Sequence, residues 1–138
     1  MKSIPQHYDD LAPLREQYYQ KNQYYYSQLI SHYRYFIPPQ KKILEVGCGA
    51  GMLLNALDPL IGVGIDVSGE MIKSAREKYP HLEFHQTNIA HLDVDITFDY
   101  IVLSGLIGEL EDIQKFFEDL KLFCHKDTRI MIEYYSVL

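Results

Sequence analysis

Apolar residues along this chain fall into short blocks separated by amphipathic segments. Five blocks predict strands, at residues 42–46, 61–66, 82–86, 98–104 and 128–135. Most are rich in Ile, Val and Leu with little alternation, as expected of strands buried on both faces. Three segments between the blocks place apolar residues at helical spacing, at residues 50–57, 69–79 and 110–124. The alternation predicts an α/β domain whose mostly parallel sheet is covered by helices.

The first 39 residues follow a different pattern. Residues 18–35 hold seven tyrosines. Over residues 14–37, apolar side chains recur at helical spacing and form a stripe of Leu14, Tyr18, Tyr25, Leu29, Tyr33 and Phe36. The prolines at 38–39 end this helix, because proline cannot continue the hydrogen-bond ladder. We therefore expect a tyrosine-rich helical extension at 1–39, followed by a second region at 40–138. We expect the tyrosine stripe to be a packing face; the alternative is an aromatic lid over substrate.

Composition narrows the classes of function. With 138 residues and 47% hydrophobic residues, the chain can build one domain with its own core. No apolar run approaches the roughly 20 residues that cross a bilayer, and the first residues lack a signal-peptide core, so we expect a cytoplasmic protein without membrane attachment. Cys48 and Cys124 form no disulfide or zinc pattern. A formal charge of −6 makes a nucleic-acid partner unexpected.

A glycine-rich turn follows the first predicted strand of the sheet. Gly47, Gly49 and Gly51 are spaced two apart and lead into the next helix, and Glu45 precedes them inside the apolar strand. Glycine is needed where φ is positive or where backbone approaches a ligand closely. Ligands of open α/β sheets bind beyond the carboxyl ends of the strands, so this turn is predicted to face a ligand.

The acidic residues indicate which ligand this turn binds. Asp66 ends the second predicted strand, where a carboxylate can accept both hydroxyls of a ribose. This feature alone does not separate NAD from another nucleoside cofactor. The dinucleotide fingerprint requires a third glycine where this chain has Met52, and Glu45 would repel a pyrophosphate. Glu45 instead suits a ligand that carries positive charge, such as an amino group and a sulfonium.

The segments "ILEVGCGAG" and "GVGIDVSGEMI" resemble the class I S-adenosylmethionine-dependent methyltransferases, and the resemblance runs from about residue 40 to the end. It implies a doubly wound, Rossmann-like sheet in the order 3-2-1-4-5, with S-adenosylmethionine as cofactor. The implied cofactor contacts are Glu45, Gly47, Gly49 and Gly51 at the methionine end, Asp66 at the ribose, Val67 and Met71 beside the adenine, Asn88 and Ile89 at its edge, and Leu103 and Ser104 where cofactor meets substrate.

Asn88, in "HQTNIAHL", departs from the family, which usually has an aspartate at this position. An asparagine can still accept a hydrogen bond from the adenine amine through its amide oxygen. The alternative is that Asn88 is a simple turn residue. Met71 has a similar alternative, because a methionine at helical spacing also serves as core.

The sequence says less about the methyl acceptor. A general base is needed only when the acceptor must lose a proton. Weak catalytic candidates are Glu109, after the fourth predicted strand, Tyr134, near the end of the fifth with Glu133 and Tyr135, and Tyr8, in a segment that often folds over the cofactor in this family. Each has a structural alternative: Glu109 could favour the start of a helix near residue 110, and Tyr134 could be an ordinary strand residue. The histidines show no metal-ligand spacing.

The resembled family usually adds a helix and an antiparallel hairpin after the fifth strand. We therefore expect the S-adenosylmethionine-binding domain at 40–138 to be truncated after its fifth strand, with the C-terminal strands missing. The alternatives are that the edge is covered by another subunit or by the N-terminal helix. The main functional hypothesis is methyl transfer to a small-molecule acceptor. The alternatives are a non-catalytic S-adenosylmethionine-binding module or partner subunit and, less favoured, an NAD-dependent oxidoreductase.

Overall fold

The computed structural model describes residues 9–10, 12–14, 17, 20–104 and 110–133. Within them, parallel strands form one sheet in the order β3-β2-β1-β4-β5. The strands are β1 (Lys42–Val46), β2 (Ile61–Asp66), β3 (Glu83–Gln86), β4 (Phe98–Ser104) and β5 (Cys124–Glu133). This order confirms the predicted Rossmann-like sheet. All carboxyl ends meet at one edge, called the ligand edge below; the amino ends form the opposite edge.

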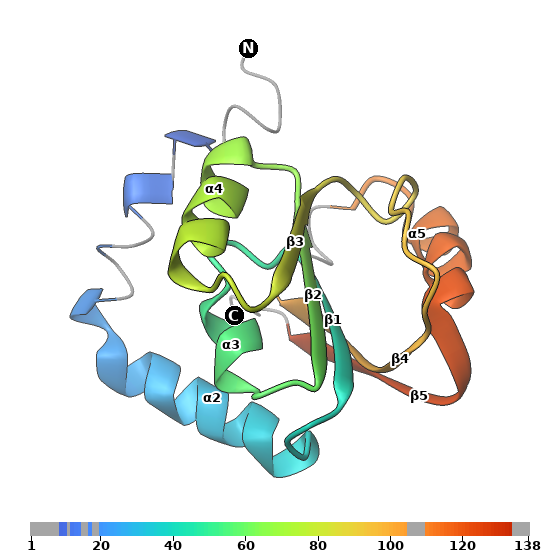
Figure 1. The fold of residues 1–138 in the computed structure, drawn as a ribbon, viewed down its shortest axis with the longest axis horizontal. Helices are drawn as coiled ribbons and strands as arrows, with labels where there is room; N and C mark the ends of the chain where they lie inside the picture. Colours follow the sequence, from blue (N-terminus) through green and yellow to red (C-terminus); the bar gives the residue numbers. More distant parts are fainter. Residues whose placement is uncertain (1–8, 11, 15–16, 18–19, 105–109, 134–138) are drawn as a thin grey trace.

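Helices cover both faces of the sheet (Figure 1). On one face lie α2 (Gln23–Phe36), α3 (Met52–Ala56) and α4 (Gly69–Lys78). On the other lies α5 (Ile113–Leu120), continued by the 3-10 turn η2 (Lys121–Phe123). The fold is therefore doubly wound, as predicted. No helix among the described residues is long and apolar enough to span a bilayer.

The strand register assigns each side chain to a face. Glu45 of β1 lies opposite Val102 of β4, and Ser104 lies opposite Glu133 of β5. Side chains alternate along a strand, so Glu45, Val102, Ser104 and Glu133 share one face. This is the face of α2, α3 and α4, because Val102 packs in one cluster with Tyr33 of α2 and with the buried leucines of α3. The sheet therefore places two carboxylates beneath α2 near the ligand edge.

The N-terminal helix takes part in the core through a narrow face. Tyr33 and Ile37, where the helix ends, are buried against the sheet, and Leu29 and Ile30 pack beside them. The Arg34 Nε donates to the Ala56 carbonyl at the end of α3, 2.8 Å away. Because α2 shares this core, its packing is continuous with that of residues 40–133; a division of the chain at residue 39 stays a prediction.

The predicted packing stripe of this helix is only partly correct. Tyr33 is buried and Leu29 is half-buried, but Leu14, Tyr25 and Phe36 are exposed, as are Tyr24 and Tyr35 outside the stripe. α2 itself begins at Gln23, after a turn at Asn22. Fewer residues of the helix therefore contact the sheet than the stripe predicted. Helical spacing indicates which side of a helix is apolar but not how many of its turns lie over the sheet. Tyr18 lies outside the described residues.

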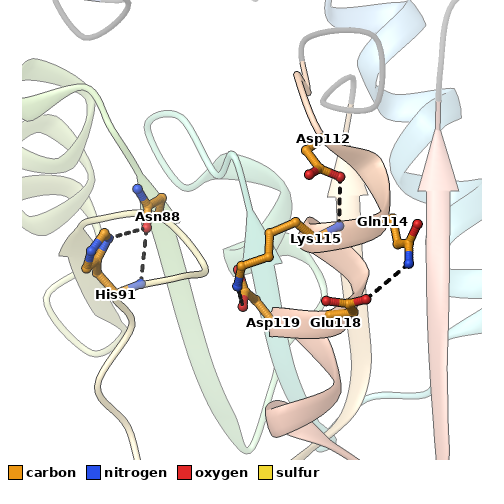
Figure 2. A network of polar contacts seen from close by, with 7 residues as sticks. All are labelled: Asn88, His91, Asp112, Gln114, Lys115, Glu118 and Asp119. Atoms are coloured by element: carbon orange, nitrogen blue, oxygen red, sulfur yellow. Dashed lines mark hydrogen bonds and ion pairs between the residues drawn. The ribbon is translucent and has the colours of Figure 1, made fainter.

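The last helix and strand have different ends from those predicted. α5 begins at Ile113 rather than at residue 110, because the Asp112 carboxylate accepts the Lys115 N–H at 3.0 Å and caps the helix (Figure 2). The helix ends at Leu120, and the next three residues form η2. β5 begins at Cys124, which pairs with Phe98 before a shift of register. The polar residues after Cys124 concealed this first part of the strand.

Candidate cofactor site

In the glycine turn between β1 and α3, Gly49 and Gly51 are needed for different steric reasons. All three glycines of the turn have positive φ, which side chains rarely adopt. A Cβ on Gly51 would lie 2.7 Å from the Phe84 ring, so this glycine lets α3 pack against β3. A Cβ on Gly49 would meet nothing closer than the Met71 sulfur, at 4.0 Å. Gly49 thus leaves open space at the ligand edge, whereas Gly51 serves packing.

The backbone N–H groups of this turn are largely used inside the protein. Gly47 and Cys48 both donate to the Ile65 carbonyl, at 2.8 and 3.0 Å. Gly51 donates to the Cys48 carbonyl and Gly49 to the Asp66 carboxylate. A turn that cradles phosphates must point its N–H groups at the ligand. With four of them bonded internally, this turn is poorly suited to a pyrophosphate.

Asp66 connects the turn to the second strand and to the start of α4. Its Oδ2 accepts the Gly49 N–H at 2.9 Å, and its Oδ1 accepts the Ser68 N–H at 2.9 Å. The side chain is only 8% exposed. Because each carboxylate oxygen accepts about two hydrogen bonds, one site remains on each oxygen for a ligand hydroxyl. Asp66 can therefore hold the turn and accept a pair of ribose hydroxyls at the same time.

The start of α4 joins this region to the N-terminal segment. Ser68 caps the helix, since its Oγ accepts the Met71 N–H at 3.2 Å. The same hydroxyl donates to the Asp9 carboxylate, which also accepts the Glu70 N–H at 3.0 Å. Asp9 thus brings the N-terminal segment beside Asp66. The neighbouring candidate Tyr8 lies outside the described residues.

Glu45 supplies a negative charge inside the sheet. It is 3% exposed and lies on the face of α2. Burial raises the pKa of the Cys48 thiol, and the charges of Glu45 and Asp66 raise it further. Glu45 also contributes to the raised pKa of Tyr33. As carboxylates, Glu45 and Asp66 would favour a cationic group in the space that Gly49 leaves open.

The loop after β3 starts beside Asp66, whose carbonyl accepts the Thr87 N–H at 3.1 Å. Figure 2 shows that the Asn88 side chain is occupied by its own loop: its Oδ1 accepts the His91 N–H at 3.1 Å and contacts His91 Nδ1 at 2.9 Å. When His91 Nδ1 carries the proton, both lone pairs of this oxygen are used, and it can accept from an adenine amine only after one contact breaks. The Ile89 side chain is buried in the core on the α5 face.

The remaining predicted cofactor residues lie around this edge. Met71 is buried, with its sulfur turned toward Gly49, and Val67 holds the Gln86 amide through its carbonyl at 3.3 Å. Leu103 is buried in the α5-side core, and Ser104 ends β4. The structure thus gathers the glycine turn, Asp66 and Met71 most closely. The individual contacts with a cofactor stay predictions.

A residue that the sequence indicated only as part of the packing stripe lies at the same edge. Tyr33 of α2 donates its hydroxyl to Glu133 Oε2 at 3.0 Å, and Ser104 donates to the same oxygen at 3.2 Å. Tyr33 is separated from Glu133 by 100 residues, and helical spacing indicated only a packing role. The other acceptor-side candidates, Glu109 and Tyr134, lie outside the described residues.

Residues 43–127, more than half of the chain, match the family model described as "Methyltransferase domain". The chain belongs to this methyltransferase family. The match includes the glycine turn, Asp66 and β4, whereas Asp9, Tyr33 and Glu133 lie outside it. It confirms the resemblance to S-adenosylmethionine-dependent methyltransferases, whose cofactor is S-adenosylmethionine.

Curated relatives match shorter parts of the chain. A putative methyltransferase, 235L, of Invertebrate iridescent virus 6 is 33% identical over 70 residues, covering 48% of this chain and 26% of the viral protein. The trans-aconitate 2-methyltransferase of Rhodopseudomonas palustris (strain BisB5) is 27% identical over 89 residues, covering 59% of this chain and 35% of the enzyme. The matched part of the methyltransferase domain thus spans about a quarter to a third of these relatives.

Solved structures share the fold. The complex of DhpI with S-adenosylhomocysteine superposes with a TM-score of 0.73 over 92% of this chain and 65% of DhpI, at 18% identity. At that identity the likeness concerns the fold alone. The residues of this methyltransferase domain also fit the cofactor chemically, because the turn offers open space at Gly49, lies beside the Glu45 and Asp66 carboxyl groups and has few free donors for phosphate. Among the described residues, no cluster of three or more His, Cys, Asp or Glu could hold a metal.

Proposed function

We propose that this methyltransferase domain binds S-adenosylmethionine at the ligand edge and transfers its methyl group to a small-molecule acceptor. The observation that carries the proposal is the buried Asp66 carboxylate, which joins Gly49 to the start of α4 and keeps acceptor sites for ribose hydroxyls. Glu45 supports it, because a buried negative charge beside the turn suits the cationic methionine end of the cofactor better than a pyrophosphate.

The protein's part in this reaction is binding and orientation. The bound cofactor supplies an electrophilic methyl group, and in-line displacement by the acceptor needs the two reactants held in register. Asp66 would fix the ribose, the turn at Gly49 would accommodate the methionine end, and Glu45 would favour its positive charge. Helices cover both faces of the sheet (Figure 1), and the acceptor would approach at the ligand edge, where the glycine turn and Asp66 lie.

A second candidate function is a non-catalytic S-adenosylmethionine-binding module or partner subunit. The Asp66 carboxylate and the glycine turn would serve cofactor binding equally well in such a module. The exposed Ile130 and Ile132 on β5, the edge strand of the described sheet, support a further C-terminal segment or a second subunit covering this edge. Both candidates require the cofactor but only the first requires methyl transfer.

Thermal denaturation with S-adenosylhomocysteine or NADH tests the cofactor assignment. A ligand that binds only the folded state stabilises it by about 2.7 kcal/mol at 100 times its Kd. We expect S-adenosylhomocysteine to raise the Tm by several degrees and NADH to leave it unchanged. The reverse pattern would overturn both candidates. Transfer of a labelled methyl group to a metabolite mixture then separates them, because only the enzyme gives a labelled product.

A further inference from the structure

The contact of Tyr33 and Ser104 with Glu133 lies at the end of a groove. The groove runs between α2 and β5, encloses about 300 Å³, and is lined by Leu29, His32, Tyr33, Phe36 and residues 131–133. Ligand pockets for small molecules start at about this volume. Its walls are mostly apolar, and Glu133 is the acidic residue among them.

Glu133 is held in a defined orientation by two different elements. Tyr33 of α2 and Ser104 at the end of β4 both donate to Oε2, at 3.0 and 3.2 Å. Neither bond uses Oε1, so this oxygen keeps its capacity to accept a hydrogen bond from a ligand. Among the described residues, no lysine or arginine forms an ion pair with Glu133. The charge of this carboxylate is therefore available to a cation in the groove.

Tyr33 connects this carboxylate with the cofactor side. Burial raises the pKa of the Tyr33 hydroxyl well above its ordinary value, and the negative charges of Glu133 and Glu45 raise it further. The hydroxyl therefore stays protonated and remains a donor. The strand register places Glu45 and Glu133 on the same face of the sheet as α2, so the groove and the glycine turn lie on the same side of the ligand edge.

We propose that Glu133 binds the methyl acceptor, with Tyr33 and Ser104 as positioning residues, and that the acceptor is a small amine with an apolar body. The proposal rests on the function proposed above. An amine would donate to Oε1 and find its charge complemented, while its apolar part would lie against Leu29, Phe36 and Met131. A carboxylate ligand would instead be repelled by Glu133 and find no described arginine or lysine in the groove.

Binding of two probes of similar size and opposite charge tests this assignment. 3-Phenylpropylamine and 3-phenylpropanoate are titrated into the full chain saturated with S-adenosylhomocysteine, with NMR or calorimetry as readout. We expect the amine to bind at least tenfold more tightly than the carboxylate. We expect Glu133→Gln to weaken the amine about tenfold and to abolish the discrimination between the probes. Tyr33→Phe keeps the buried ring and removes only the hydroxyl. It should reduce the ratio of the two probe affinities severalfold and change the Tm less than Tyr33→Ala does.

Glu118→Gln is the matched control, because it removes the same charge from an exposed position on α5, on the other face of the sheet. It should leave both affinities unchanged. Equal binding of the two probes, or an unchanged amine affinity in Glu133→Gln, would overturn the inference. The affinity for S-adenosylhomocysteine, measured on the same samples, keeps the two proposals apart. If it is retained while Glu133 has no effect, only the acceptor assignment fails; if it is absent, the proposed function fails first.

Discussion

Two aspartates hold backbone N–H groups at opposite edges of the same sheet. Asp66, at the ligand edge, accepts from Gly49 and Ser68. Asp99, at the amino end of β4, accepts the Lys42 N–H at 2.9 Å and contacts His125 Nε2 at 3.0 Å. Both carboxylates tie neighbouring segments together, and the hydrogen bonds alone would not tell which edge binds a ligand.

Their surroundings distinguish them. His125 Nδ1 accepts the Asp127 N–H, so Nε2 carries the proton and donates to Asp99. An Asp–His pair of this kind resembles a catalytic pair, but it joins the amino ends of β1, β4 and β5, far along the strands from the glycine turn. Asp66 is buried beside positive-φ glycine and open space. A binding site therefore needs both a held carboxylate and room beside it.

The largest expected effect comes from removing each aspartate in turn. Asp66→Ala leaves two buried N–H groups without their acceptor, so we expect a loss of about 3 kcal/mol in the free energy of unfolding. It should also weaken S-adenosylhomocysteine binding by about 1–3 kcal/mol, measured by calorimetry. Asp99→Ala should cost about 1 kcal/mol of stability, because its partners can reach water, and should leave the affinity unchanged.

If Asp66→Ala and Asp99→Ala changed the affinity for S-adenosylhomocysteine by the same amount, the distinction between a ligand-binding and a structural aspartate would be wrong. An unchanged affinity in Asp66→Ala would remove Asp66 from the site. If that variant fails to fold, Asp66→Asn retains the shape and one acceptor oxygen, and the same calorimetric comparison applies.

The next largest effect separates two glycines of the ligand edge by their effects on stability and on cofactor affinity. Gly51→Ala adds positive-φ strain of about 1–2 kcal/mol and a contact with the buried Phe84 ring, for a total of about 2–4 kcal/mol in urea unfolding. Gly49→Ala bears only the strain, about 1–2 kcal/mol, because its Cβ enters open space. Affinity should show the reverse order, with Gly49→Ala weakening S-adenosylhomocysteine more among folded molecules. The same ranking for stability and affinity would contradict separate roles for the two glycines.

The sequence predicted the elements that bury apolar residues on both sides. The bounds of β1, β2 and β4 agree with the predicted segments, because their apolar runs are nearly continuous. The polar residues inside them are Glu45 in β1, which is buried, and Asp99 in β4, which accepts the Lys42 N–H. Errors arose where single side chains set the ends. Asp112 starts α5 three residues later than the apolar periodicity indicated, and hydrogen bonds of His125 and Thr128 organise the polar start of β5.

The candidate site was predictable where its residues are close in sequence. The turn and Asp66 follow a short motif, and the structure brings them together through the Gly49 hydrogen bond. Tyr33 could not be found in this way, because its contact with Glu133 depends on how α2 crosses the sheet. Both interpretations of Asn88 stay open: its oxygen accepts the His91 N–H in the local turn, and its contact with an adenine amine stays a prediction.

The smallest expected effect concerns the pH dependence of the opposite edge. The Lys42 N–H, followed by His125, lowers the pKa of Asp99 below its ordinary value. Since the folded pKa lies below the unfolded one, the stabilising contribution is complete above about pH 4 and is lost as the pH falls through the folded pKa. The urea midpoint of wild type should therefore approach that of Asp99→Asn between pH 5 and pH 3. Because Asp99 is largely solvated, the change should be well below that of Asp66→Ala. A difference between the two proteins that stays constant over this range would show that the Asp99 charge contributes nothing, and that the amino edge is held by the shape of its hydrogen bonds alone.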